Sequence, residues 1–290
     1  MMLSETARAK VNLTLEVLGR RPDGYHELRS LVAFADYGDT LRLEAPSAPF
    51  SLDIDGPFAA ALEGPNLVQM AAALFARVAS ETSAACASGA FRLTKRIPVA
   101  AGLGGGSADA AAALRLLSRL APEARPLESL LALAAQLGAD VPVCLLSQPA
   151  VMTGIGERLT LLPGFPKLPA VLVNPRMPLA TAAVYRELRA APLEGDSIGE
   201  AEPAALHSVD AVLDYARQRR NDLEASARRL LPAVGAILAR LEQMPGAVLA
   251  RLSGSGPTCF ALFRAWRDAE AAARSLRAER TDWWVEATTL

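Results

Sequence analysis

The chain has 290 residues, of which 51% are hydrophobic and 21% are charged, and its formal net charge is −1. A chain of this length can bury a sizeable core without disulfides or a metal, and it is long enough for two domains. The basic residues form no basic face, which argues against a nucleic-acid partner. No window reaches the roughly 20 apolar residues of a membrane span, and the N-terminus lacks the apolar core of a signal peptide.

The three cysteines, Cys86, Cys144 and Cys259, lie far apart in the sequence. An odd number of cysteines without a C-x-x-C pair argues against a disulfide framework and against structural zinc, and it favours a reducing compartment. We therefore expect a cytoplasmic globular protein with no membrane or nucleic-acid partner.

The first strand is predicted from an alternation of apolar and polar residues over residues 9–18. Val11 and Leu13 fall on one side and Lys10 and Asn12 on the other, which is typical of a half-buried strand. Two strands joined at Tyr37-Gly38-Asp39 are predicted next. Further along, the patterns predict a strand, a helix capped by Asn66 and another strand, over residues 50–55, 66–81 and 91–98.

The remainder of the chain mixes helical and strand-like patterns without a regular alternation, which favours an α+β fold over a doubly wound sheet. Helices are predicted over residues 108–120, 128–140 (ended by Gly138), 181–188, 209–217, 221–243 and after 264. Strands are predicted over residues 141–146, 153–163 and 170–175, and two strands around a glycine turn over residues 247–263. A polar loop is expected over residues 189–206. Pro163, Pro166 and Pro169 suit a boundary between an N-terminal domain of residues 1–160 and a C-terminal domain of residues 161–290.

The stretch "IPVAAGLGGGSADAAAAL", residues 97–114, places four glycines within five positions directly before a helix rich in alanine. Glycine lets the backbone approach a ligand closely, and unpaired N–H groups at a helix start favour an anion. Alanine then starts the helix firmly, which holds those donors in place. The stretch therefore predicts a phosphate site, with Ser107 either capping the helix or offering its hydroxyl to a phosphate-bound metal.

Common phosphate motifs do not match this stretch. G-x-x-x-x-G-K-[ST] fails because lysine is absent, G-x-G-x-x-G fails because Ser107 stands in the place of the last glycine, and the protein-kinase motifs are missing. The alternative interpretation is a flexible surface loop. A serine hydrolase is a second alternative, because "SGSGP" (Ser253 to Pro257) is similar to a nucleophile elbow, but G-x-S-x-G also fails there.

The segment "PVAAGLGGGSA" resembles the phosphate-binding motif of the GHMP small-molecule kinases, which include galactokinase, homoserine kinase and mevalonate kinase. Within this family, "AKVNLTLEVLGRRPDGYHEL", "YGDTL", "LGADVPVCL" and "SGSGPTCFALF" resemble the branch that phosphorylates a cytidine-containing sugar alcohol. The resemblance extends from about Ala9 to Phe263. It implies a two-domain α+β kinase with the active site in the interdomain cleft.

The reaction that this resemblance implies uses ATP and Mg²⁺ to phosphorylate the 2-hydroxyl of 4-diphosphocytidyl-2-C-methyl-D-erythritol in isoprenoid precursor biosynthesis. The partner would then be this small molecule, and the enzyme would be a monomer or a homodimer. A GHMP kinase of other specificity and a non-catalytic nucleotide-binding module remain alternatives.

The resemblance also assigns roles to residues. Lys10 and Asp140 match the catalytic pair, in which the lysine would keep the carboxylate ionised. Asn12, Tyr25, His26 and Tyr185 match the substrate contacts, the last three at the cytosine. The ATP contacts are Asn66, Leu67, Pro98, Ala101, Gly102, Leu103, Gly104, Gly105, Gly106, Ser107 and Ala108, with Ser107 also reaching the Mg²⁺.

Two residues depart from the family pattern. Val32 stands where some relatives place phenylalanine, and Ala108 replaces a second serine. Without the resemblance, Lys10 would be read as a solvated charge at a strand edge and Asp140 as a turn or cap residue. Tyr25 and His26 would be read as surface residues beside a turn.

Overall fold

The computed structural model describes residues 2–44, 50–78, 89–121, 125–194 and 206–290. The chain forms two compact units, each built from separate segments: residues 1–9, 37–99 and 104–147 in the first, and residues 10–36, 100–103 and 148–290 in the second. Because β1 (Met2–Asn12) and β3 (His26–Glu44) continue from one unit into the other, each unit contains part of these strands.

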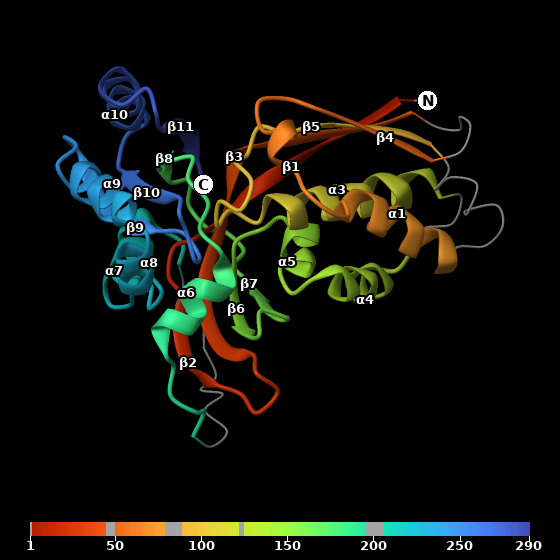
Figure 1. Cartoon of the computed structure of the whole chain (residues 1–290), viewed down its shortest axis with the longest axis horizontal. Helices are drawn as coiled ribbons and strands as arrows, with labels where there is room; N and C mark the ends of the chain where they lie inside the picture. Colours follow the sequence, from red (N-terminus) through yellow and green to blue (C-terminus); the bar gives the residue numbers. More distant parts are fainter. Residues whose placement is uncertain (1, 45–49, 79–88, 122–124, 195–205) are drawn as a thin grey trace. The chain divides into compact units, whose positions relative to one another are not determined.

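The first unit combines helices with strands β4 (Ser51–Asp55) and β5 (Ala90–Thr94) (Figure 1). β4 pairs parallel with β5, and β5 pairs antiparallel with residues 40–44 of β3. The helices are α1 (Leu67–Val78), α3 (Gly105–Leu120), α4 (Leu127–Leu137) and α5 (Val141–Leu146), with the short 3₁₀ helix η1 at Ala59–Ala61. The alanine-rich α3 packs against α1, α4 and α5, since small side chains allow close approach.

The second unit contains an antiparallel sheet with the order β11-β8-β10-β9 (Figure 1). Its strands are β8 (Pro169–Asn174), β9 (Ala247–Leu252), β10 (Cys259–Phe263) and β11 (Trp284–Thr289). Strands β2 (Glu16–Arg20) and β6 (Ala150–Gly154) pair with the first half of β3, and β7 (Arg158–Leu161) pairs with β6. The helices are α6 (Thr181–Leu188), α7 (Val209–Arg217), α8 (Glu224–Leu230), α9 (Pro232–Glu242) and α10 (Trp266–Glu279).

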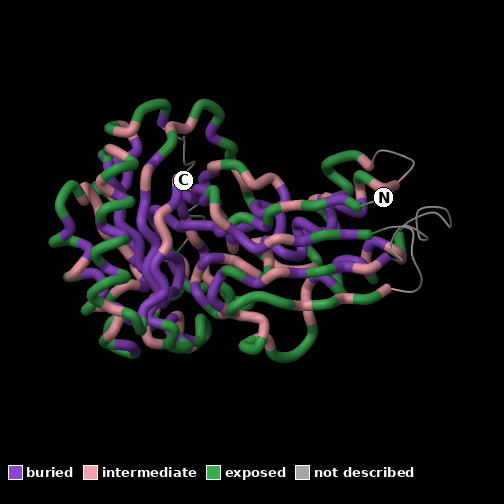
Figure 2. The backbone as a smooth tube through the Cα atoms, turned by 90° about the horizontal axis from the view of Figure 1, so that it is seen from above, coloured by how far each residue is buried: buried purple, intermediate pink, exposed green. Residues whose placement is uncertain are grey.

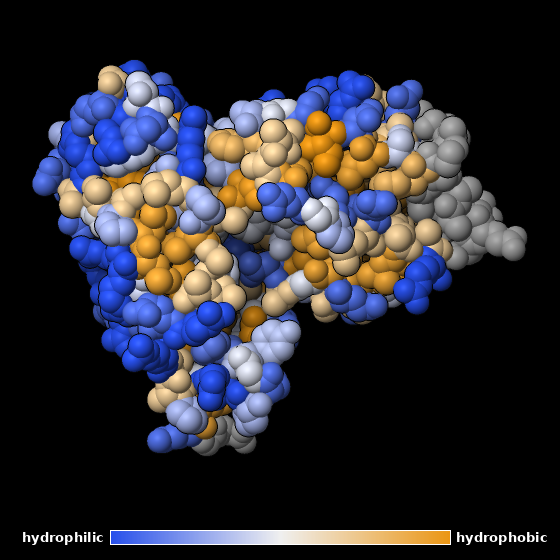
Figure 3. All heavy atoms as spheres, viewed as in Figure 1, coloured by the Kyte–Doolittle hydropathy of each residue, from blue (hydrophilic) through white to orange (hydrophobic). Residues whose placement is uncertain are grey.

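The two central strands of the four-stranded sheet, β8 and β10, are almost entirely buried, while the helices beside the sheet expose one side, as the purple and green tubes of Figure 2 show. Val171, Val173 and Phe263 from the sheet pack with Ile237 and Leu276 of α9 and α10. The outward sides of these helices are hydrophilic (Figure 3), and Arg240 of α9 forms a 2.7 Å ion pair with Glu279 of α10. None of the helices in the described ranges has the length and apolar character required to cross a membrane.

Most predicted elements are present, and the α+β class is confirmed, but β3 corrects one prediction. Residues 26–44 form one continuous strand, so Tyr37-Gly38-Asp39 is not a turn. Gly38 stands there because a β-carbon at this position would lie 2.2 Å from the carbonyl oxygen of Ala7 on β1. Close packing of two strands, rather than a turn, requires this glycine.

The prediction of a half-buried strand over residues 9–18 is also wrong. The strand β1 ends at Asn12, β2 begins at Glu16, and all of residues 9–15 are buried. Polar side chains such as Asn12 and Thr14 are buried because they hydrogen-bond within the unit, which the alternation could not reveal.

Residues 141–146 form the helix α5 rather than the predicted strand. Proline is tolerated in the first turn of a helix because the N–H that it lacks has no partner there, so Pro142 does not prevent this helix. The prediction of one helix over residues 221–243 is wrong as well, since Pro232 starts a new helix after Leu231 and separates α8 from α9. The last strand, β11, was not predicted.

Three predictions involve residues outside the described ranges: Cys86, residues 79–81 of the helix predicted over 66–81, and residues 195–205 of the polar loop. Cys144 and Cys259 are buried, and neither forms a disulfide.

Candidate functional site

The first unit presents the amides at the start of α3. Gly104 precedes this helix with a φ of 63°, and the N–H of Ala108 donates to the carbonyl of Gly104 at 2.8 Å. The N–H groups of Gly105, Gly106 and Ser107 therefore have no acceptor within the helix, which is the arrangement that favours an anion. Ser107 lies inside the first turn, so the prediction that it caps the helix is wrong.

The start of α1 lies beside this turn. A β-carbon on Gly106 would be 3.4 Å from Cδ1 of Leu67, so the structure brings Leu67 and the glycines together as the resemblance implies. Asn66 accepts a 2.8 Å hydrogen bond from the N–H of Val68, which confirms it as the cap of α1. Pro98 is buried in the same unit, just before the glycine stretch.

Asp140 stands at the N-cap position of α5, with φ and ψ of −85° and −13°, and its side chain is partly exposed. The backbone N–H of Cys144 donates to the Asp140 carbonyl at 3.2 Å, which begins the short helix. Asp140 belongs to the first compact unit, whereas Lys10 belongs to the second.

A buried ionic cluster in the first unit was missed by the sequence reasoning. The ammonium of Lys95 contacts the carboxylates of Asp39 and Asp109, the latter at 2.7 Å. Asp39 was assigned to a turn, and Asp109 was counted as part of the alanine helix. One signal was available: charged residues on otherwise buried segments are usually paired.

In the second unit, Ser253 forms hydrogen bonds with the end of β1 and with part of the glycine stretch. Ser253 accepts a 3.1 Å hydrogen bond from the N–H of Asn12 and donates a 3.0 Å hydrogen bond to the carbonyl of Gly102. Gly102 has a φ of +73°, and a β-carbon there would lie 2.5 Å from the Ser253 carbonyl. A residue with a side chain would therefore be strained and would clash.

Lys10 is only 4% exposed, so the interpretation as a solvated charge at a strand edge is wrong. Its backbone N–H donates to the carbonyl of Leu103 at 2.9 Å, and the carbonyl of Ala101 accepts from the N–H of Thr258 at 3.1 Å. Asn12 also donates from Nδ2 to the hydroxyl of Ser30 at 2.8 Å. The structure thus brings Lys10, Asn12 and residues 101–103 together within the second unit.

The two aromatic rings predicted at the cytosine also meet in this unit. The centroids of His26 and Tyr185 are 4.8 Å apart, with an angle of 34° between the ring planes. Burial lowers the pKa of His26, and the positive charge of Arg20 lowers it further, so the neutral imidazole predominates at neutral pH. Tyr25 is 59% exposed beside them, and its N–H donates to Asp23 in a turn.

Asn221 and Ser255 support the same turn and were not predicted as site residues. The amide of Asn221 donates to the carbonyls of Leu252 and Gly254 at 2.9 and 2.8 Å. Ser255 shares a 2.9 Å hydrogen bond with Thr181, at the start of the helix that carries Tyr185. The resemblance of "SGSGPTCFALF" to the family was the signal available for this turn.

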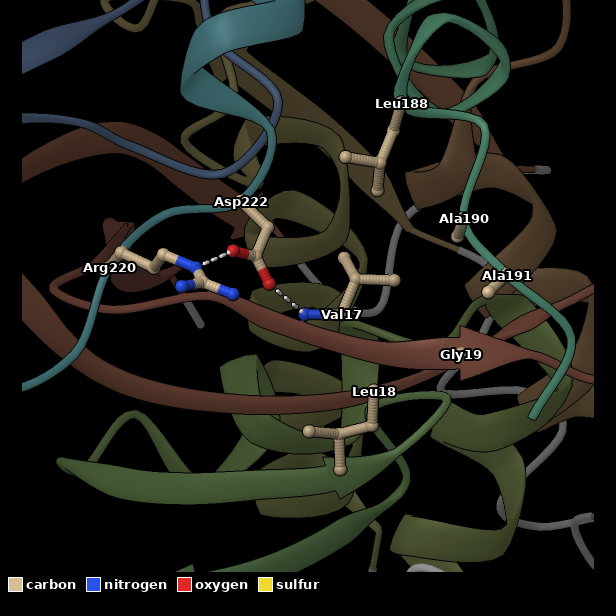
Figure 4. Close-up of a pocket in the computed structure, with 8 residues that line it drawn as sticks. All are labelled: Val17, Leu18, Gly19, Leu188, Ala190, Ala191, Arg220 and Asp222. Carbon is tan, nitrogen blue, oxygen red and sulfur yellow. Dashed lines mark hydrogen bonds and ion pairs between the residues drawn. The ribbon is translucent and has the colours of Figure 1, made fainter. Parts of the chain in front are cut away.

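A pocket of about 230 Å³ lies elsewhere in the second unit (Figure 4). Val17, Leu18 and Leu188 give it an apolar lining, while Asp222 accepts from the N–H of Val17 at 2.8 Å and pairs with Arg220. None of the predicted site residues lines it.

Comparison with known proteins identifies the family. Residues 66–148 match the model of the GHMP kinases N terminal domain, and residues 203–281 match that of the GHMP kinases C terminal domain. Together these ranges make up more than half of the chain. The chain belongs to the GHMP kinase family.

This GHMP kinase has relatives that match it over nearly their whole length. It is 50% identical to the 4-diphosphocytidyl-2-C-methyl-D-erythritol kinase of Rhodopseudomonas palustris (strain HaA2), over 99% of this chain and 98% of that protein. It is 47% identical to the protein of the same name from Methylorubrum extorquens (strain PA1), over 100% of this chain and 99% of that one.

Solved structures also support membership of the GHMP kinase family. A crystal structure of 4-(cytidine 5'-diphospho)-2C-methyl-D-erythritol kinase superposes on this GHMP kinase with a TM-score of 0.76 and 36% identity, covering 99% of this chain and 98% of that one. The homoserine kinase of Cytophaga hutchinsonii gives a TM-score of 0.70 at 16% identity, over 99% of this chain and 94% of that one, which shows a shared fold alone.

Proposed function

We propose that this GHMP kinase transfers the γ-phosphoryl group of ATP to the 2-hydroxyl of 4-diphosphocytidyl-2-C-methyl-D-erythritol, giving the 2-phosphate. The step belongs to the non-mevalonate (MEP) route to isoprenoid precursors. The observation that carries the proposal is the identity of about half of all residues with kinases of that name, over the whole chain. The N–H groups of Gly105, Gly106 and Ser107 support it, because they have no acceptor within α3 and can donate hydrogen bonds to a nucleotide phosphate.

In this proposal the segment from Pro98 to Ala108 binds the phosphates of ATP, and Asn66 and Leu67 lie at the nucleoside. The contact expected between Leu67 and a β-carbon on Gly106 supports a common site for the two segments. No described residues form a cluster of three or more metal-ligating His, Cys, Asp or Glu side chains. The Ser107 hydroxyl fits a Mg²⁺ ion that arrives with ATP, and such an ion would neutralise charge on the phosphates.

Asp140 is proposed to accept the proton of the 2-hydroxyl, and Lys10 to stabilise the negative charge that develops during transfer. Phosphoryl transfer needs positioning, charge neutralisation and a deprotonated nucleophile more than covalent chemistry. The N-cap position of Asp140 supports its role, since the start of α5 fixes the backbone of this residue. A general base of this kind contributes about 10²- to 10⁴-fold to the rate.

The substrate side of the proposal uses Asn12, Tyr25, His26 and Tyr185. A neutral His26 can donate one hydrogen bond and accept another, which suits the edge of a cytosine. The aromatic ring of Tyr185, 4.8 Å from that of His26, is suited to packing against a base.

We also propose that residues 1–160 and 161–290 are the two family domains, which is supported by the matches to residues 66–148 and 203–281. The two compact units of the structure divide the chain differently from these two domains, because each unit is built from three separate segments of the sequence. The enzyme is proposed to act in the cytoplasm as a monomer or a homodimer. The buried thiols of Cys144 and Cys259, which form no disulfide, support a reducing compartment.

The proposal is tested by incubating the protein with ATP, Mg²⁺ and 4-diphosphocytidyl-2-C-methyl-D-erythritol and measuring ADP. We expect ADP release that depends on this acceptor, while homoserine and mevalonate give none. Release with mevalonate or homoserine alone would assign a different specificity. Binding of ATP without turnover of any of the three acceptors would indicate a nucleotide-binding module.

A further inference from the structure

A buried chain of hydrogen bonds in the second unit fixes the side chain of Asn12 at the end of β1. Nδ2 of Asn12 donates to the hydroxyl of Ser30 on β3 at 2.8 Å, and that hydroxyl donates to the carbonyl of Thr14 at 2.5 Å. The exposed fractions of Asn12, Thr14 and Ser30 are only 3%, 0% and 2%. Because the three residues are enclosed, their polar groups depend on one another for these hydrogen bonds.

The direction of this chain follows from the carbonyl at its end. A backbone carbonyl can only accept, so the single hydroxyl hydrogen of Ser30 is committed to Thr14. Toward Asn12 the Ser30 oxygen can then only accept, and the atom that faces it must be Nδ2 rather than Oδ1. Ser30 therefore selects one of the two orientations that the Asn12 amide can take.

The two residues that hold the chain in place are themselves tied to the sheet. Oγ1 of Thr14 accepts from the N–H of Leu31 at 3.0 Å, and the N–H of Thr14 donates to the carbonyl of Leu31 at 3.4 Å. Ser30 lies opposite Met152, where β3 pairs with β6. The Ser30 hydroxyl is thus presented to Asn12 from a fixed backbone.

The other end of the Asn12 amide, Oδ1, lies beside the turn that contains Gly254. A β-carbon on Gly254 would be 3.2 Å from Oδ1 of Asn12 and 3.1 Å from the carbonyl of Gly102. No described residue donates a hydrogen bond to Oδ1, and this oxygen is not among the fully enclosed atoms that lack a partner. The second unit therefore presents an oriented acceptor that a ligand can reach, beside glycines whose missing side chains leave room.

We propose that Ser30 is a positioning residue for the acceptor substrate. By fixing the amide of Asn12, Ser30 turns Oδ1 toward the sugar alcohol, so that Oδ1 accepts a hydrogen bond from one of its hydroxyl groups. With the amide reversed, that hydroxyl would meet an N–H donor, and its own hydrogen would lose this partner. The inference rests on the proposed function, since it assumes that the ligand beside Asn12 is an alcohol.

The substitution Ser30→Ala removes the acceptor for Nδ2 and lets the Asn12 amide take either orientation. The contact with the acceptor is then weakened in the ground state and in the transition state alike. We expect KM for the cytidylyl substrate to rise roughly tenfold, the equivalent of one hydrogen bond, with kcat unchanged. KM for ATP should stay the same, which a general loosening of the fold would not produce.

The test is steady-state kinetics of the full-length protein with ATP, Mg²⁺ and 4-diphosphocytidyl-2-C-methyl-D-erythritol. The variants are Ser30→Ala, Asn12→Ala and the two combined. If Ser30 acts through Asn12, the double variant should show the same roughly tenfold rise in acceptor KM as each single variant, whereas independent effects would multiply to roughly a hundredfold.

The matched control is Ser226→Ala on α8. Ser226 is fully buried, and its hydroxyl accepts from Arg229 at 3.1 Å, so this variant also loses an enclosed hydroxyl but not one bonded to a predicted site residue. We expect both of its KM values to equal those of the wild type.

An unchanged acceptor KM in Ser30→Ala, an equal rise in KM for ATP, or multiplied effects in the double variant would overturn the inference while leaving the proposed function intact. No turnover of this acceptor by the wild type would instead remove the proposed function, and the inference with it. If Ser30→Ala fails to fold, a neutron crystal structure of the deuterated wild type decides. A Ser30 deuteron directed at the Thr14 carbonyl supports the inference, and one directed at Asn12 contradicts it.

Discussion

Replacing Ser253 by alanine tests the hydrogen bonds that hold the first strand and the glycine stretch within the second unit. Ser253 is fully buried, and its hydroxyl serves both the Asn12 N–H at 3.1 Å and the Gly102 carbonyl at 3.0 Å. The substitution leaves the buried N–H of Asn12 and the partly buried carbonyl of Gly102 without this partner. Each such loss costs about 1–3 kcal/mol, and partial relaxation reduces the sum, so we expect a loss of about 2–4 kcal/mol in the free energy of unfolding.

The matched control for this experiment is Ser255→Ala, two residues away in the same turn. The Ser255 hydroxyl bonds Thr181, which is exposed, so water can replace the lost partner. We expect a cost of about 1 kcal/mol or less for this control.

The assay is equilibrium unfolding in urea, followed by circular dichroism, for the wild type and both variants. Because Asn12 and residues 101–103 are proposed to contact substrate and ATP, Ser253→Ala should also raise both KM values. The reasoning would be refuted if Ser253→Ala were within about 0.5 kcal/mol of the wild type, or no less stable than Ser255→Ala.

Three further predictions follow from single groups of the site. Asp140→Asn should lower kcat by about 10²- to 10⁴-fold with little change in KM, and an unimpaired kcat in steady-state assays would exclude it as the base. Since the pKa of His26 is lowered, substrate binding that uses its neutral form should be constant above pH 7. KM for the cytidylyl substrate should then rise only as the pH falls well below 6.5, and a rise between pH 8 and 7 would contradict this. Gly102→Ala should destabilise the protein by about 2 kcal/mol or more in urea, because its φ is +73° and the new methyl meets the Ser253 carbonyl; a neutral effect would disprove the strain.

The sequence predicted those parts of the fold that depend on local patterns. The helix after the glycine stretch, the Asn66 cap and the hairpin around residues 253–258 all have local signals, and the structure confirms them. The segment 141–146 was misassigned because a short apolar run fits either a strand or a buried helix, and only packing against α3 and α4 decides between them.

Burial of polar residues could not be predicted from alternation. Lys10 and Asp39 lie on strands whose neighbours in space come from distant parts of the chain, such as Leu103 and Lys95. Motif resemblance supplied Lys10 and Asp140 as candidates, but not the cluster at Asp109. No local rule connects an aspartate on α3 to a lysine that follows β5, since tertiary packing alone brings the two together.

The central claim is that the start of α3 binds the phosphates of ATP. A crystal structure of the protein with Mg²⁺ and a non-hydrolysable ATP analogue tests it most directly. We expect the phosphate oxygens to accept hydrogen bonds from the N–H groups of Gly105, Gly106 and Ser107, which have no acceptor within the helix. Phosphates bound at another surface, with these three amides left to solvent, would contradict the account.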